Sequence, residues 1–228
     1  MLSLLILAFV GYVIYCYINR DRAETRSRGG VFTKMSDARG ALGERAIQKE
    51  LARILPTICG DDFYLHSGPA ILLHAPGTAY PSAEIDHLVI TQFGVFVIET
   101  KHWSGRVRPS PSLDHLIRIS PSGLSETRKS PLAQNRTKVA FLQKTVSGMG
   151  CPVRSVGVFA APNCTLEGDL HPDLIYSSDL PQWLVAQRDL HLSAGFERLS
   201  ISVLTNRILS ACDLSHDAEA RHRATVMR

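Results

Sequence analysis

The chain has 228 residues, enough for one well-packed domain once a non-globular N-terminus is set aside. Apolar residues make up 45% of the chain and charged residues 20%, values that exclude extensive disorder and indicate a globular protein. The net charge of +4 permits contact with phosphate or with an anionic membrane surface, but it is too small to indicate either.

The N-terminal stretch from Leu2 to Ile18 is apolar and uncharged, and its 17 residues are near the minimum for a helix that crosses a bilayer. Four arginines follow it within residues 20–28, whereas no basic side chain precedes it. By the positive-inside tendency, the sequence predicts a single-pass anchor over residues 1–19, with the N-terminus outside and the remaining chain in the cytoplasm. A basic linker over residues 20–36 follows. A cleaved signal peptide is the alternative, but the stretch is long for one and lacks a basic start.

Residues 37–55 repeat apolar side chains at helical spacing after capping candidates, which predicts a helix. Ile47, Leu51 and Leu55 mark its buried face. Glu44 lies three residues before Ile47 and seven before Leu51, so its carboxylate falls on or beside that apolar face. A surface ion pair is the other interpretation of an acid on a helix, and it suits Glu44 poorly.

Short apolar runs separated by Gly, Pro and Asn/Asp predict several strands after this helix. The runs are FYLH (63–66), AILLHA (70–75), a paired stretch within 84–105 and HLIRIS (115–120). We then expect a helix over 131–146, a buried strand within 152–162, and weaker helices at about 180–190 and 197–211. This order predicts an α/β domain over residues 37–213, with a central mixed β-sheet flanked by helices. A polar C-terminal tail over residues 214–228 completes the chain.

The stretch EIDHLVITQFGVFVIETKHWSG, residues 84–105, reads as two apolar strands joined by a tight turn. A two-residue turn at Gln92 and Phe93 pairs Thr91 with Gly94, and the same register sets Asp86 opposite Glu99. Such partners lie about 4.5 to 5.5 Å apart at Cβ and point to the same side. A three-residue loop with a bulge at the glycine is the alternative, and a slip of one residue would send Asp86 to the opposite face.

In this register Asp86, Glu99 and Lys101 converge at the end of a central strand. Two carboxylates that close repel each other, and a divalent cation between them relieves the repulsion. Carboxylate oxygens and water suit Mg²⁺ or Mn²⁺, and Lys101 could orient a water or neutralise charge on a phosphate. The pattern is typical of metal-dependent phosphodiester hydrolysis. An exposed Glu-x-Lys pair beside an unrelated aspartate is the structural alternative.

Three ordered motifs, GALGERAIQKEL, EIDHLVITQFGVFVIETKHWSG and SPLAQNRTKVAFL, resemble the nuclease-related domain (NERD) family of the PD-(D/E)xK nuclease superfamily. The resemblance covers residues of about 40 to 160 and implies a restriction-endonuclease-like core. It also implies that Asp86, Glu99 and Glu44 bind the metal, that Lys101 is the catalytic lysine, and that Gln134 lies beside the site. The proline of the superfamily's name is missing before Asp86, as is usual in this family.

Other side chains near these motifs have weaker interpretations. His87 and His102 are sequence neighbours of the acids, so their side chains should point to the opposite face of the sheet. They could support the site from there, or be ordinary core or surface residues. Trp103 could stack on a base, or pack at the strand end. A diffuse set of basic side chains could form a phosphate-contacting rim or a solvated face: Arg106, Arg108, Arg118, Arg128, Lys129, Arg136, Lys138 and Lys144.

The five cysteines show no CxxC pair and no Cys/His spacing typical of zinc sites, so the sequence predicts neither a structural zinc nor a disulfide framework. Together the patterns predict a membrane-anchored, Mg²⁺- or Mn²⁺-dependent nuclease in the cytoplasm. DNA is the favoured substrate, and RNA is the alternative. The alternative is a non-catalytic nucleic-acid-binding or scaffold module with a nuclease-like fold at the inner membrane face. The enzyme is favoured because a scaffold has no physical need for mutually repelling acids around one point.

Overall fold

The computed structural model describes residues 38–226, in which the chain from Leu42 onward forms a compact unit. This unit is a mixed α/β domain, as the order of apolar runs predicts. Its central sheet has the strand order β1-β4-β5-β9-β11. The strands are β1 (Phe63–Leu65), β4 (His87–Thr91), β5 (Gly94–Lys101), β9 (Val153–Phe159) and β11 (Leu174–Tyr176).

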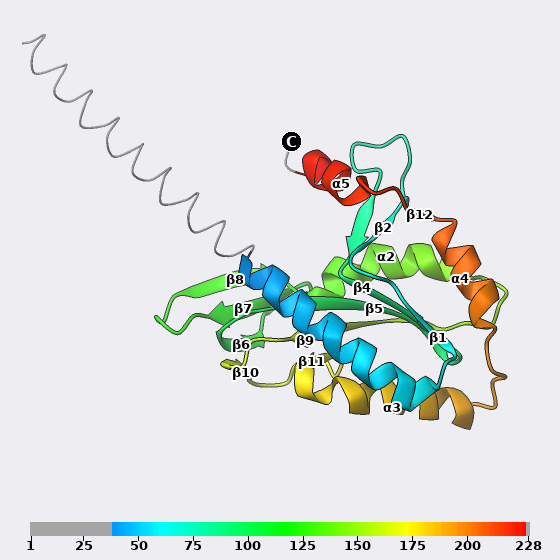
Figure 1. The fold of residues 1–228 in the computed structure, drawn as a ribbon. Helices are drawn as coiled ribbons and strands as arrows, with labels where there is room; N and C mark the ends of the chain where they lie inside the picture. The colour runs from blue at the N-terminus through cyan, green and yellow to red at the C-terminus, as the bar shows by residue number, and fades with distance from the viewer. Residues whose placement is uncertain (1–37, 227–228) are drawn as a thin grey trace, which may run out of the picture. The chain divides into compact units, whose positions relative to one another are not determined.

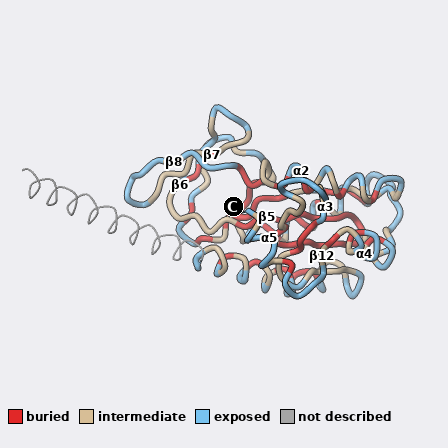
Figure 2. The backbone as a smooth tube through the Cα atoms, turned by 90° about the horizontal axis from the view of Figure 1, so that it is seen from above, coloured by how far each residue is buried: buried red, intermediate tan, exposed pale blue. Residues whose placement is uncertain are grey.

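The central sheet is mixed because its two halves pair differently. Strands β1, β4 and β5 are antiparallel neighbours, whereas β5, β9 and β11 run parallel. In Figure 2 the buried backbone, drawn red, includes β5, whereas the residues of edge strand β1 are half-buried. Strand β5 lies in the middle of the sheet and is buried from Gly94 to Thr100, as its apolar residues of both parities predict.

Helices cover both faces of the central sheet (Figure 1). One apolar cluster joins the first described helix (residues 38–59) and α3 (Leu180–Ser193) to Phe96 and Ile98 of β5. A second cluster joins α2 (Pro131–Thr145) and α4 (Ile201–Leu209) to Val95 and Val97. Alternate residues of β5, beginning with Val95 and Val97, therefore face α2. Glu99 and Lys101 continue this series and lie on the same face.

Helix α2 approaches the sheet closely at its first turn. Pro131 occupies the first helical position, which suits proline because that position needs no backbone donor. Beneath it lies Gly157, where a Cβ atom would come within 2.6 Å of the Pro131 Cβ atom. Because Gly157 pairs with Glu99 in the ladder, this contact sets the start of α2 above the end of β5.

A second sheet extends from the central one and was only partly predicted. Its order is β10-β6-β7-β8, formed by β10 (Cys164–Leu166), β6 (Gly105–Pro109), β7 (His115–Ile119) and β8 (Ser125–Lys129). The sequence predicts β7, whereas β6 and β8 have too few apolar residues to show a strand pattern. Val107 is the buried residue of β6, and its neighbours in the strand are exposed.

The remaining elements lie beside these sheets. A small third sheet has the order β12-β2-β3, from β12 (Cys212–Asp213), β2 (Ala70–Leu72) and β3 (Ala83–Ile85). A short 3-10 helix, η1 (Ser177–Asp179), precedes α3. Residues 218–226 form helix α5 (Ala218–Val226), where the sequence predicts a frayed polar tail. The short α5 was missed because Ala218 is its one residue buried in the described chain.

The predicted localisation at a membrane is corrected by the structure. Within residues 38–226 no helix is both long enough and apolar enough to cross a bilayer. The stretch on which that prediction depended, residues 1–19, and the predicted linker, residues 20–36, lie outside the described residues.

Candidate active site

The hairpin of β4 and β5 has the register that the two-residue turn predicts. Thr91 pairs with Gly94, and the ladder continues to His87 opposite Ile98, which leaves no slip at the turn. Gly94 has a φ of 152°, and a Cβ there would lie 2.9 Å from the Pro152 carbonyl oxygen. Glycine at this position therefore permits the tight turn and also the close approach of the chain just before β9.

Asp86 lies one step beyond this ladder, level with the end of β5. It occupies a bend between β3 and β4, where the chain passes from the third sheet into the central one. Its Oδ2 atom accepts a hydrogen bond of 2.8 Å from the backbone N–H of Thr100. This bond fixes the aspartate beside Glu99, as the register predicts.

Glu99 is held between two lysines from different elements. The Lys101 ammonium group donates to Glu99 Oε1 at 2.7 Å, and the Lys138 ammonium group donates to Oε2 at 3.0 Å. Glu99 is only 5% exposed, so both ion pairs lie largely out of water. Burial alone would raise the pKa of Glu99, but Lys138 and Lys101 outweigh it and hold the pKa below its usual value.

Helix α2 supplies the amide groups that position these lysines. Gln134 accepts a 3.0 Å hydrogen bond from Lys101 through Oε1, and its Nε2 donates to the Lys129 carbonyl oxygen. Asn135 is fully buried; its Oδ1 accepts from Lys138 at 2.9 Å, and its Nδ2 donates to the Val97 carbonyl oxygen. Each ammonium group is thus oriented by one carboxylate and one amide.

Asp86 has the opposite electrostatic situation. Burial, and after it the negative charge of Glu99, raise its pKa to about 7, against the lowering effects of the Thr100 N–H and the two lysines. At neutral pH, Asp86 is therefore poised between its charged and neutral forms. An added cation beside Asp86 and Glu99 would favour the charged form.

Glu44 lies on the first described helix, close enough to act electrostatically on the site. Burial raises the pKa of its carboxyl group; Arg223 and Lys101 lower it, and Glu99 raises it. The helix approaches the end of β5 at Gly43, where a Cβ atom would lie 3.0 Å from the Cβ of His102. The structure therefore brings together the elements that carry all five predicted site residues.

An open cleft of about 530 Å³ lies over this cluster. Asp86, Glu99, Gln134 and Lys138 line it, together with Glu84 and Lys129. The C-terminal helix α5 supplies the remaining wall through His222, Arg223 and Val226.

Asn135 and Arg223 have no role in the sequence-based prediction, which includes Lys138 only in the diffuse set of basic side chains. Lys138 lies one helical turn after Gln134, a spacing that could have placed both over the same strand. Asn135 gave no signal, because a buried asparagine in a polar helix looks like an exposed one. Arg223 gave none because its helix has almost no apolar face.

His87 supports the site from the other face of the sheet. Its Nδ1 lies 2.8 Å from Gln48 Oε1, and its Nε2 lies 3.0 Å from the Thr100 hydroxyl. Burial lowers the pKa of this histidine to about 4, so it is neutral at physiological pH. Trp103 packs edge-on against Phe159, with the ring centroids 5.7 Å apart.

Most of the basic side chains that could form a phosphate-contacting rim or a solvated face do not line the cleft. Arg106 and Arg108 pair with Glu167, Arg118 and Arg128 with Glu126, and Arg136 with Asp114. Of the eight, Lys129 and Lys138 line the cleft.

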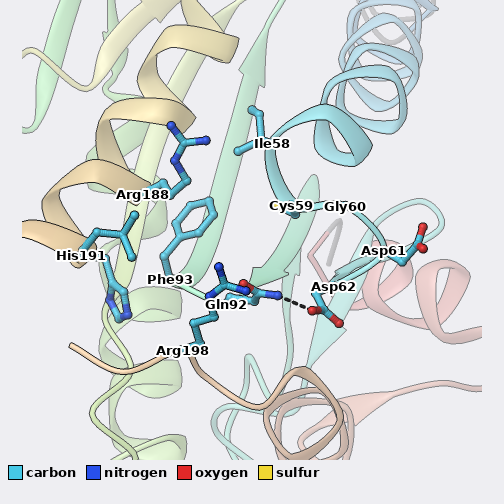
Figure 3. Close-up of a pocket in the computed structure, with 11 residues that line it drawn as sticks. Ile58, Cys59, Gly60, Asp61, Asp62, Gln92, Phe93, Arg188, His191 and Arg198 are labelled. Atoms are coloured by element: carbon cyan, nitrogen blue, oxygen red, sulfur yellow. Dashed lines mark hydrogen bonds between the residues drawn. The ribbon is translucent and has the colours of Figure 1, made fainter. Parts of the chain in front are cut away.

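A larger cavity of about 670 Å³ lies at the other end of β5, beside the turn at Gln92 and Phe93 (Figure 3). Asp62 accepts a hydrogen bond from the Gln92 side chain at its rim, and Arg188, His191 and Arg198 also line it. None of the predicted site residues lines this cavity within the described chain.

A mixed sheet between helix layers defines a mixed α/β protein, in which acids and a lysine lie at the carboxyl end of the central strand β5. The chain belongs to the nuclease-related domain family, whose model matches residues 39–160, more than half of the sequence. That family is part of the PD-(D/E)xK-like nuclease superfamily, which confirms the resemblance predicted from the motifs.

An uncharacterized protein of Bacillus anthracis is 24% identical to this chain over 191 residues, which cover 81% of this chain and 82% of that protein. No solved structure matches the chain. The match to the family model includes Glu44, Asp86, Glu99, Lys101 and Gln134, and it ends before α3, α4 and α5.

Proposed function

We propose that this protein is a divalent-metal-dependent nuclease that hydrolyses phosphodiester bonds. DNA is the favoured substrate, and RNA is the alternative. One observation carries the proposal: Asp86 and Glu99 meet at the ends of adjacent strands, and Lys101 bonds to Glu99 from the same strand. Membership of a nuclease-related family supports it. The restriction-endonuclease-like core implied by the motifs is part of the same proposal.

The donor chemistry of the site suits Mg²⁺ or Mn²⁺. Asp86 and Glu99 would hold the ion with water, and Glu44 would approach from the first described helix. The raised pKa of Asp86 supports this assignment, because burial and the nearby charge of Glu99 disfavour its charged form and a bound cation would offset both effects. Bound there, a divalent ion would polarise a phosphoryl oxygen and lower the pKa of a water ligand.

The free protein does not hold a preformed metal cage. Within residues 38–226, no group of three or more His, Cys, Asp or Glu side chains is placed to hold a metal ion. Both Glu99 oxygens instead accept hydrogen bonds from lysines. We infer that Glu99 exchanges an ammonium partner when the site is loaded, and that Asn135 retains Lys138 nearby.

The other residues of the site position charge. Lys101, oriented by Gln134, would neutralise the charge that develops on the phosphate or orient the attacking water. Gln134 would keep Lys101 in place by bridging it to the Lys129 carbonyl oxygen.

The experiment is a cleavage assay with the purified full-length chain. Linear DNA, circular DNA and RNA are incubated with Mg²⁺, Mn²⁺ or EDTA, beside Lys101→Met and the exposed control Arg53→Ala. We expect cleavage that needs the metal, survives in Arg53→Ala and falls by about 10²- to 10⁴-fold in Lys101→Met. Equal cleavage in EDTA, or in Lys101→Met, would contradict the proposal.

A non-catalytic nucleic-acid-binding module is the second candidate. It is favoured by the two lysines on Glu99, which neutralise that acid without a metal. Binding of DNA or RNA without cleavage under Mg²⁺ or Mn²⁺ would identify this second function.

A further inference from the structure

Helix α5 returns the C-terminal part of the chain to the cleft. It lies outside the residues 39–160 that the family model matches. It contacts strands β2 and β3, and Figure 1 shows it in red beside β2. Its residues His222, Arg223 and Val226 line the same cleft as Asp86 and Glu99.

Specific contacts fix the orientation of α5 although it buries little. Its Ala218 is buried, and His222 Nδ1 lies 2.9 Å from the hydroxyl of Ser82, at the entry to β3. Arg221 forms a 2.6 Å ion pair with Asp213 of β12 and a second one with Asp217. These bonds hold the helix so that the next residues, His222 and Arg223, face the cleft.

Arg223 carries its charge into the acidic side of the site. It lines the cleft together with Glu84 of β3, Asp86 and Glu99. Its side chain therefore belongs to the same open cleft as these acids.

Little structural need accounts for this arginine. Its ion pair is with Glu219, one turn earlier on the same helix, and 60% of its side chain is exposed. Such exposed pairs stabilise a helix by only about 0.3 to 0.5 kcal/mol. A guanidinium group also has five N–H donors in a planar fork, so most of its donors stay available to a second anion.

We propose that Arg223 is a substrate-binding residue, which contacts a backbone phosphate of the nucleic acid beside the bond that is cleaved. The inference rests on the proposed function and extends the site to a helix that the family match leaves out. A phosphate fits because its oxygens accept a bidentate bond from arginine. Lys129 and Lys138 line the same cleft and place further positive charge near the nucleic-acid backbone.

The test compares Arg223→Ala and Arg223→Lys with Arg53→Ala. Arg53 is a matched control, because it pairs with Glu50 one turn earlier on its own helix and does not line the cleft. Binding of a fluorescent DNA duplex and a single strand is measured by anisotropy in EDTA at several salt concentrations. KM and kcat are measured with Mg²⁺, and thermal melting checks that each variant is folded.

For Arg223→Ala we expect Kd and KM to rise about 5- to 30-fold with a smaller change in kcat. The slope of log K against log salt should fall by about 0.9 for a duplex, the value for one lost phosphate contact. Arg223→Lys should keep the salt slope and recover part of the affinity, because lysine retains the charge without the fork. Arg53→Ala should bind like the unchanged protein.

Equal affinities for Arg223→Ala and Arg53→Ala would overturn the inference. So would a gain of activity in Arg223→Ala, which would make α5 an inhibitory cover. Binding that depends on Arg223 in a protein that never cleaves would support the inference while the nuclease proposal fails. Absence of all binding by the unchanged protein would overturn both.

Discussion

The two ends of strand β5 carry cavities that differ in size and in chemistry. The larger one, at the turn end, has its acid Asp62 exposed and bonded to Gln92 of the turn. The smaller cleft, at the carboxyl end, contains Glu99, buried and held by two lysines. The comparison shows that a candidate site is better identified by buried charges from different elements than by volume.

The physical cause of the difference is the position of each charge in the sheet. Glu99 lies on a central strand with neighbours on both sides, so its charge must be compensated by other side chains. Asp62 lies at the start of edge strand β1 and is solvated. Charges in the cleft are therefore coupled to one another, whereas Asp62 is exposed to solvent, which weakens its interactions.

The largest difference in nuclease activity is expected when one acid of each cavity is replaced in turn. Asp86→Asn keeps an acceptor for the Thr100 N–H but removes the charge, so we expect nuclease activity to fall by about 10²- to 10⁴-fold. Asp62→Asn should stay within about twofold, as for an exposed substitution away from the site. Initial rates with Mg²⁺ measure both, and equal losses would remove the distinction between the two cavities.

The pH dependence of stability should reveal two opposed groups at the cleft end. His87, with its pKa lowered to about 4, stays neutral in the folded chain while the unfolded chain takes up a proton below pH 6.5. Its contribution therefore falls as the pH drops, by about 2 kcal/mol at pH 5. Asp86, with its pKa raised to about 7, binds a proton in the folded chain first, so its contribution rises by about 2 kcal/mol between pH 7 and pH 5.

Urea unfolding at pH 7 and pH 5 separates these two contributions. Asp86→Asn should lose stability on acidification relative to the unchanged protein, because only the histidine effect remains. His87→Gln should gain stability on acidification by the same comparison. Identical pH dependence in all three proteins would show that neither group is perturbed as described.

A smaller difference, in the free energy of unfolding, is expected when one side-chain amide is removed from the cleft and one from the turn end of β5. Asn135→Ala removes the amide partner of the buried Lys138 ammonium group and of the Val97 carbonyl oxygen, which should lower the free energy of unfolding by about 1 to 3 kcal/mol. Gln92→Ala removes an exposed hydrogen bond and should cost less than about 0.5 kcal/mol. Urea denaturation at pH 7 measures both values, and a similar cost at the two positions would argue against a coupled network in the cleft.

Sequence patterns predicted the parts of the site that depend on strand register. Alternation along β5 and a two-residue turn were enough to place Asp86 near Glu99, because one glycine and one ladder fix the pairing. Helix periodicity likewise placed Glu44 beside an apolar face, and Pro131 marked the start of α2. These are local relations, which a single sequence contains.

The rest depends on contacts between elements that are distant in the chain. The bend at Asp86 arises because β3 joins a different sheet from β4, and no pattern in the residues around it indicates that change. The pairing of Lys138 with Glu99 depends on how closely α2 approaches the sheet, which Gly157 determines. Strands β6 and β8 were missed because their charged residues face solvent.

The most direct test of the central claim is anomalous X-ray diffraction from crystals of the protein soaked with Mn²⁺. We expect a manganese peak within bonding distance of the Asp86 and Glu99 carboxylates, with Lys101 still bonded to Gln134. A Glu99 side chain that keeps both lysines, with no manganese peak beside Asp86, would contradict it.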